Sequence, residues 1–219
     1  MQTVTRTYEH GVNGASPYNG LFSMPGYQVY EYQLVLAIPD TIKDRIRKLR
    51  QQFSEQYNLP APRYSAVMIP LVKFRQRQLL EEKMRSSLHQ LVMGWRPFTV
   101  NLKDYKSMPT HSIYIPVTSK SALQQCGREL KSMQHLLRPD TIHNPFFPLE
   151  QQLIIAARLP PGIYEKAWQQ YAYRHFNAQF MVDACLLLKR RSGEQHWQIL
   201  QRMELKDMPV GVKQGMLFA

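Results

Sequence analysis

Basic and aromatic side chains flank two apolar segments of this chain, at residues 64–70 and 151–158, and they are the first candidates for chemistry. These side chains are Arg63, Tyr64, Lys73, Arg75 and Arg158. An arginine can donate two parallel hydrogen bonds to one phosphate, which favours Arg158 as a phosphate contact, and a tyrosine ring can stack on a base. The same residue types also solvate the ends of strands, so a ligand site and an ordinary surface both remain open.

The seven histidines are scattered along the chain, and none belongs to an H-x-H or H-E-x-x-H pattern that would bind a metal. We therefore expect no metal site and no cofactor. Two of them, His111 and His143, lie near the apolar segments. His143 is in a proline-rich loop just before the second segment, where it could reach the rim of a cleft between the two.

The two cysteines, Cys126 and Cys185, fall within a predicted helix and a predicted strand and have no C-x-x-C spacing, which indicates buried free thiols. No apolar run approaches the roughly 20 residues that a membrane span needs. The polar N-terminus also lacks the apolar stretch of a signal peptide. These features predict a cytoplasmic protein without a membrane partner.

Charge is the most informative bulk property, because 28 Lys and Arg residues against 16 Asp and Glu give a formal net charge of +12. Such an excess attracts polyanions, and RNA or a nucleotide is the natural candidate partner. A charge that only keeps the protein in solution is the alternative. The sequence does not specify an oligomeric state.

Alternating patterns of period two and of three to four predict both strands and amphipathic helices in this chain of 219 residues. The predicted strands are 30–38, 64–72, 98–102, 112–117, 152–157, 178–189 and 196–205. The predicted helices are 41–57, 76–95, 119–137 and 163–174. The first helix has an apolar stripe that includes Ile46 and Phe53, and a basic face that we expect to carry Lys43, Arg45, Arg47, Lys48 and Arg50.

The order strand, helix, strand occurs early in the chain and again late, and each copy contains one of the two apolar segments. We therefore predict an α+β protein with a pseudo-duplicated, two-lobed architecture. Residues 27–205 are expected to form the single two-lobed domain. Residues 1–26, rich in Gly and Pro, are expected to be a flexible arm, and residues 206–219 a peripheral extension.

Over roughly residues 30–205 the chain resembles the 2H phosphoesterase superfamily, specifically its 2′-5′ RNA ligase (LigT-like) family. The resemblance rests on the opening YQLVLAIP before an amphipathic helix, on Met68-Ile69-Pro70, and on LIIAAR at 153–158 before the helix with Ala167-Trp168. It implies antiparallel sheets that line a central cleft, with helices outside. It also implies two H-x-T/S motifs facing each other, whose histidines act as general base and general acid and whose hydroxyls bind phosphate oxygens.

This sequence departs from that pattern at both motifs. The positions equivalent to histidine and hydroxyl are Ser65 and Val67 in the first motif, and Gln152 and Ile154 in the second. A shifted alignment places Leu149 and Gln151 at the second motif and again supplies no histidine. Neither serine nor glutamine titrates near neutral pH, so the acid and base catalysis of the family is expected to be lost. Whether the protein is an enzyme is therefore left open.

Three hypotheses follow. The first is a catalytically impaired or inactive LigT-like protein that binds RNA or a nucleotide in a basic cleft. The second is an active phosphodiesterase on 2′,3′-cyclic or 2′-5′ linked RNA ends that uses substitute groups such as His143. The third is a protein-interaction scaffold in which Val67 and Ile154 extend the core.

Overall fold

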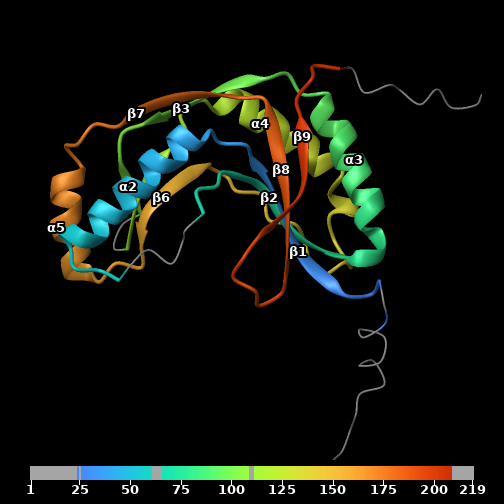
Figure 1. The fold of residues 1–219 in the computed structure, drawn as a ribbon, viewed down its shortest axis with the longest axis horizontal. Helices are drawn as coiled ribbons and strands as arrows, with labels where there is room; N and C mark the ends of the chain where they lie inside the picture. Colours follow the sequence, from blue (N-terminus) through green and yellow to red (C-terminus); the bar gives the residue numbers. More distant parts are fainter. Residues whose placement is uncertain (1–23, 25, 61–65, 109–110, 209–219) are drawn as a thin grey trace, which may run out of the picture.

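The computed structural model describes residue 24 and residues 26–60, 66–108 and 111–208, which form antiparallel sheets with helices packed against them (Figure 1). The predicted α+β class and two-lobed architecture are confirmed. The predicted arm at 1–26 and the extension at 206–219 lie almost entirely outside the described residues. Among the described helices, none is long and apolar enough to span a bilayer.

The first sheet has the strand order β2-β1-β8-β9, with every pair antiparallel. Its strands are β1 (Val29–Leu36), β2 (Pro70–Arg77), β8 (Ala184–Arg191) and β9 (Gln198–Glu204). Side chains alternate between the two faces of a strand. Tyr32, Leu34 and Leu36 of β1 are fully buried on one face, whereas Glu31 lies on the other face and is only partly buried. The sheet thus has one apolar and one more polar face.

Helix α3 (Glu81–Met93) and helix α4 (Lys120–Ser132) pack against the apolar face. The Tyr32 hydroxyl donates a hydrogen bond of 2.6 Å to the Glu81 carboxylate at the start of α3. The buried Gln76 side chain of β2 donates to the carbonyl oxygens of Leu136 and Arg138, in the segment that follows α4. Both helices therefore lie on the apolar face of the sheet.

The second lobe contains the pair β3-β7 and the sheet β4-β5-β6. Its strands are β3 (Phe98–Lys103), β4 (Lys106–Met108), β5 (Ser112–Pro116), β6 (Gln152–Ala157) and β7 (Asn177–Val182). A bridge between Leu102 and Val117 joins the two sets of strands. Strand β6 has the bounds predicted from the sequence, and it lies at the edge of its sheet, as β2 does in the first lobe.

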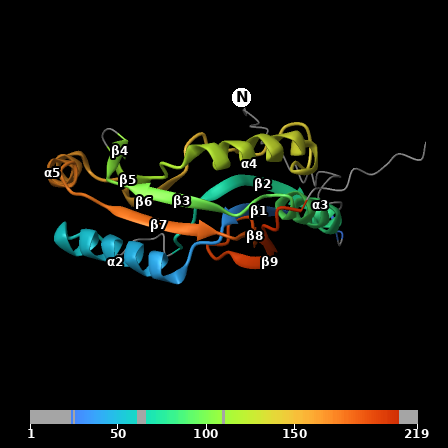
Figure 2. The ribbon, with the colours of Figure 1, turned by 90° about the horizontal axis from the view of Figure 1, so that it is seen from above.

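Segments that cross between the lobes interlock them, and a helix and a pair of strands are two examples. Helix α2 (Asp40–Gln56) follows β1 of the first sheet but packs against β6 of the second. It also contacts helix α5 (Pro161–Tyr171), where the rings of Phe53 and Tyr171 lie 5.3 Å apart. Strands β7 and β8 are separated only by Asp183, yet they belong to different lobes. Figure 2 shows α2 and α4 on opposite sides of the strands.

Three sequence predictions about these elements are wrong in detail. The strand predicted at 178–189 is two strands, because the chain changes its pairing partner from β3 to β1 at Asp183. The strand predicted at 64–72 begins only at Pro70, after the described but irregular residues 66–69, and continues to Arg77, since its pairing with β1 extends through polar residues. The following helix therefore begins at Glu81, after a short 3-10 turn.

Candidate functional site

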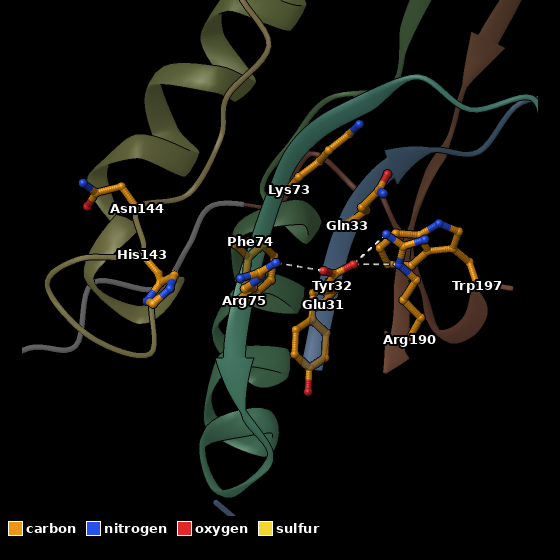
Figure 3. A pocket seen from close by; sticks show the side chains of 10 residues that line it. All are labelled: Glu31, Tyr32, Gln33, Lys73, Phe74, Arg75, His143, Asn144, Arg190 and Trp197. Carbon is orange, nitrogen blue, oxygen red and sulfur yellow. Dashed lines mark hydrogen bonds and ion pairs between the residues drawn. The ribbon is translucent and has the colours of Figure 1, made fainter. Parts of the chain in front are cut away.

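A pocket of about 360 Å³ opens on the polar face of the first sheet (Figure 3). It lies over β1, β2 and β8, and the loop before β6 and the hairpin between β8 and β9 close its two sides. Figure 3 shows His143 and Asn144 on one side, and Arg190 and Trp197 on the other. The lining residues are Glu31, Tyr32, Gln33, Lys73, Phe74, Arg75, His143, Asn144, Arg190 and Trp197.

Three charged side chains lie side by side at the floor of this pocket because of strand register. Glu31 of β1 pairs with Arg75 of β2 on one side and with Arg190 of β8 on the other. Arg75 Nη2 lies 3.2 Å from Glu31 Oε1, and Arg190 Nε donates to Glu31 Oε2 at 2.7 Å. Burial alone would raise the pKa of the Glu31 carboxyl, but the hydrogen bonds and charges of Arg190 and Arg75 hold it below its ordinary value. Glu31 is therefore ionised at neutral pH.

Lys73 adds a third cation to the pocket. Burial of its ammonium group, together with the nearby charge of Arg190, lowers the pKa of Lys73 below the usual 10.5. The residues that line the pocket thus include Lys73, Arg75 and Arg190 against the single carboxylate of Glu31, an excess of two positive charges. An anion placed here would relieve this repulsion among the cations.

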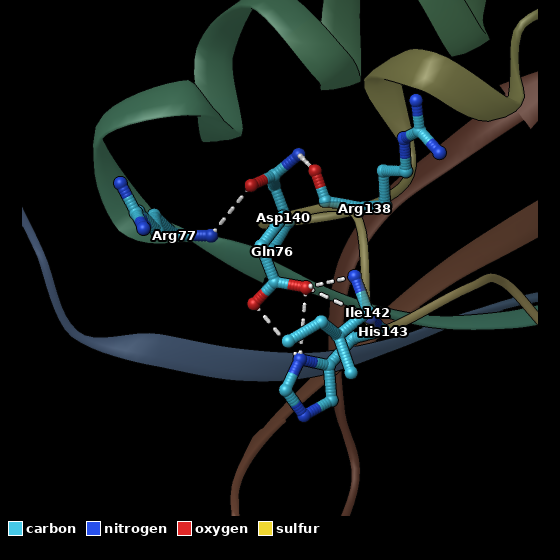
Figure 4. Close-up of polar contacts among 6 residues, drawn as sticks. All are labelled: Gln76, Arg77, Arg138, Asp140, Ile142 and His143. Atoms are coloured by element: carbon cyan, nitrogen blue, oxygen red, sulfur yellow. Dashed lines mark hydrogen bonds and ion pairs between the residues drawn. The ribbon is translucent and has the colours of Figure 1, made fainter.

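The loop before β6 is attached to β2 at Lys73, and this brings His143 to the pocket. The main-chain N–H of Lys73 donates to the carbonyl of Phe146 at 2.9 Å, and the N–H of Phe146 donates to the carbonyl of Lys73 at 2.7 Å. His143 Nδ1 lies 2.8 Å from the Asp140 carboxylate, which also accepts from the main-chain N–H groups of Ile142 and His143 (Figure 4). These bonds hold the pKa of Asp140 below its ordinary value and fix the imidazole ring.

On the opposite side, Arg190 stacks on Trp197. The guanidinium carbon lies 4.3 Å from the centre of the indole ring, within the range of a cation–π contact. Arg190 Nη1 also donates to the carbonyl of Glu194, in the turn between β8 and β9, at 3.0 Å. Gly193 has φ +89° in this turn, a conformation that glycine adopts readily. The turn therefore folds back over Arg190.

Three of the predicted ligand-binding residues, Lys73, Arg75 and His143, line this one pocket. Arg158 does not line it: it is exposed at the end of β6, with φ +57°. The other two, Arg63 and Tyr64, lie outside the described residues. The predicted ligand roles of all six remain predictions.

The positions that the resemblance equates with the two motifs differ in their surroundings, and Ser65 lies outside the described residues. Val67 belongs to the core at 4% exposure, and Gln152 is partly buried at the start of β6. Ile154 is 37% exposed, so the expectation that it extends the core is wrong: its side chain lies on the outward side of the edge strand β6.

Arg50, which we expected on the basic face of its helix, is buried instead. It lies one turn after Ile46, within the apolar stripe. Its Nε donates to the carbonyl of Ile154 at 2.9 Å, and its Nη1 to the carbonyl of Ala66 at 3.1 Å. The two apolar segments are therefore within reach of one guanidinium group.

Sequence reasoning missed Glu31, Arg190 and Trp197. A run of three basic residues, Lys189 to Arg191, begins where the strand predicted at 178–189 ends; the pair Ser192-Gly193, typical of a turn, follows it, and Trp197 comes next. These two features could have predicted a basic and aromatic hairpin, which forms one side of the pocket. The position of Glu31 between two arginines depends on strand register, which the sequence pattern does not contain.

Comparison with known proteins shows that the chain shares its fold with solved structures. A scan against protein-family models gives no match, and a search of curated proteins gives none either. Solved structures do match. The protein TT0787 of Thermus thermophilus superposes with a TM-score of 0.53 at 14% identity, over 80% of this chain and 98% of that one. Escherichia coli LigT in complex with 3′-AMP gives a TM-score of 0.52 at 16% identity, over 81% and 99% of the two chains.

Escherichia coli LigT in complex with ATP matches similarly, with a TM-score of 0.53 at 15% identity over 81% of this chain and 99% of that one. At this level of identity the match establishes the fold. The chain is therefore an α+β protein with the two-lobed fold seen in LigT and TT0787, as the sequence resemblance implied.

Proposed function

We propose that this protein binds the phosphate groups of RNA or of a nucleotide in the pocket over β1, β2 and β8, and that its catalytic power is impaired or lost. The observation that carries the proposal is the excess of two positive charges among the residues that line the pocket. Lys73 and Arg75 are the direct phosphate contacts in this proposal, because both are exposed residues that line the pocket.

Two further observations support a nucleotide ligand. The net charge of +12 favours encounter with polyanions. Solved structures of the same fold hold 3′-AMP and ATP. The impaired catalysis is supported by the motif-equivalent residues, since Val67, Gln152 and Ile154 have no group that titrates near pH 7.

Binding to a short single-stranded RNA with a 2′,3′-cyclic phosphate end tests this proposal. Fluorescence anisotropy over a salt series should show affinity that falls as salt rises, with a slope of about −0.7 for each phosphate contacted. The RNA should be intact when it is analysed afterwards. The Lys73→Ala variant should bind at least several-fold more weakly, whereas Lys83→Ala, on the exposed side of α3, should bind as the wild type does. Absence of binding at low salt would contradict the proposal.

The His143–Asp140 pair supports a second candidate, residual phosphodiesterase activity with His143 as the substitute base. A carboxylate that accepts from Nδ1–H orients an imidazole so that its Nε2 faces a substrate, which is the arrangement that base catalysis uses. His175 and Asp104 form a similar pair, at 3.2 Å, outside the pocket. If slow cleavage of the cyclic phosphate is detected, His143→Gln should abolish it and His175→Gln should not. Equal rates in both variants would exclude this candidate.

A further inference from the structure

Arg190 differs from the other cations of the pocket because each of its three guanidinium nitrogens already has a partner within the protein. Nε donates to Glu31 Oε2 at 2.7 Å, and Nη2 lies 2.6 Å from the same oxygen. Nη1 donates to the carbonyl oxygen of Glu194 at 3.0 Å. All three nitrogens therefore have a partner before any ligand arrives. The Nε–Nη2 edge, one of the two edges with which a guanidinium can hold a phosphate by two parallel bonds, is already taken by a carboxylate.

The flat face of the Arg190 guanidinium is suited to stacking on a ring. A guanidinium is planar and delocalised, and it stacks on aromatic rings and on nucleobases. Trp197 lies against this group, with the guanidinium carbon 4.3 Å from the ring centre. Both side chains line the same side of the pocket (Figure 3). Because Glu31 and Glu194 fix the orientation of the plane, little conformational freedom would be lost when a base stacks here.

Strand register sets the distance between this surface and the phosphate contacts. Arg75, Glu31 and Arg190 are neighbours across three strands, so the Cα atoms of the two arginines are about 10 Å apart at the usual strand spacing. Lys73 is two residues further along β2, or about 7 Å. His143 lies beyond β2, on the far side of the pocket from Trp197. A mononucleotide is long enough to bridge the two sides.

We infer that Arg190 and Trp197 form a stacking platform for a nucleobase, held in place by Glu31, so that the pocket selects a base-bearing nucleotide over a bare phosphate. This inference rests on the proposed function, because it assigns the phosphate to Lys73 and Arg75. It divides the pocket into two parts: the base lies on the hairpin side, and the phosphate lies on the β2 side.

Calorimetric titration with three probes separates the two parts: inorganic phosphate, ribose 5-phosphate and AMP. The wild type should bind AMP about tenfold or more tightly than ribose 5-phosphate, as expected when a base stacks on an aromatic group. Tryptophan fluorescence should be quenched by AMP. If AMP and ribose 5-phosphate bind equally well, the platform is wrong while phosphate binding stands. If none of the three binds, both the platform and the proposed function fail.

Two variants test the platform directly. Trp197→Leu should lose the preference for AMP and keep the affinity for ribose 5-phosphate, and AMP should no longer quench the remaining tryptophans. Arg190→Lys keeps the positive charge without the plane and should lose the same preference. The matched controls are Tyr173→Leu, an aromatic residue 85% exposed outside the pocket, and Arg202→Lys on β9.

Trp197 is only partly buried, so Trp197→Leu is expected to fold, and thermal unfolding of each variant checks this. Should Arg190→Lys not fold, Trp197→Leu alone decides the matter. A Trp197→Leu protein that binds AMP as tightly as the wild type, or that loses AMP and ribose 5-phosphate affinity equally, would overturn the inference.

Discussion

Arg50 of helix α2 donates a hydrogen bond from Nε to the main-chain carbonyl of Ile154 on β6, over a distance of 2.9 Å. A second bond from the same guanidinium reaches the carbonyl of Ala66, just before β2. Burial lowers the pKa of Arg50 to about 10, so the group is still charged at neutral pH. One buried cation therefore joins the two apolar segments at residues 64–70 and 151–158.

Replacing Arg50 with methionine should destabilise the protein by about 3 kcal/mol, because two carbonyl groups lose their donors. Urea denaturation measures this loss as a lower transition midpoint. The matched control is Arg47→Met, an exposed residue on the same helix, which should change stability by no more than about 0.5 kcal/mol. Equal stability of the two variants would show that Arg50 does not join the segments.

Glu31→Gln should make stability less sensitive to acid. The carboxyl has a lowered pKa in the folded state, so its contribution is fully present above the unfolded value of 4.5 and is lost as the pH falls through the lower, folded pKa. Wild-type melting temperature should therefore fall more steeply than that of Glu31→Gln across this acid range. Glu204→Gln, whose carboxylate is 60% exposed, serves as the control and should follow the wild type.

Lys73→Arg should extend nucleotide binding to higher pH. The lowered pKa of Lys73 means that the ammonium loses its proton before pH 10.5, and wild-type affinity for AMP should decline at pH values below that ordinary lysine pKa. An arginine stays charged throughout this range. Calorimetry at a series of alkaline pH values compares the two proteins. Parallel declines in both would mean that Lys73 does not contact the phosphate.

The cysteines should resist alkylation in the folded protein. Both are buried, burial raises the pKa of the Cys126 thiol to about 12, and it also raises that of Cys185. Only the thiolate reacts, and it is scarce at neutral pH in these surroundings. Mass spectrometry after treatment with iodoacetamide should find two free thiols in urea and almost no modification without it. Rapid labelling of the native protein would contradict the burial of both side chains.

Patterns that repeat within one element predicted the fold well. The apolar stripe of the first helix contains Ile46 and Phe53, and both are buried, because a helix turn fixes which residues share a face. The same stripe contains Arg50, whose charge led us to place it on the surface. The position of Arg50 in the helical period predicts its burial better than its charge does. Burial is possible because main-chain carbonyls of two segments supply the hydrogen-bond acceptors that a buried arginine needs.

Only the part of the candidate site that lies near the two apolar segments was predicted from the sequence. Lys73 and Arg75 flank the first apolar segment, and His143 precedes the second, so sequence proximity was enough to select them. Glu31 and Arg190 come from strands that are far apart in sequence, and Trp197 lies in the hairpin loop that follows β8. Their meeting depends on the pairing of β1 with β8 and on the geometry of one hairpin turn, and non-local pairing of this kind leaves no local pattern.

The crossing of α2 and of the β7–β8 run between the lobes has a mechanical consequence. Each lobe takes its strands and its covering helix from stretches that are separate in the sequence. Dividing the chain into two fragments should therefore give pieces that do not fold on their own. For the same reason there is no flexible linker at which the lobes could swing apart along the described crossings. The pocket over β1, β2 and β8 is built on one of these interlocked lobes, so it should keep its shape when a ligand binds, without closure of the protein around it.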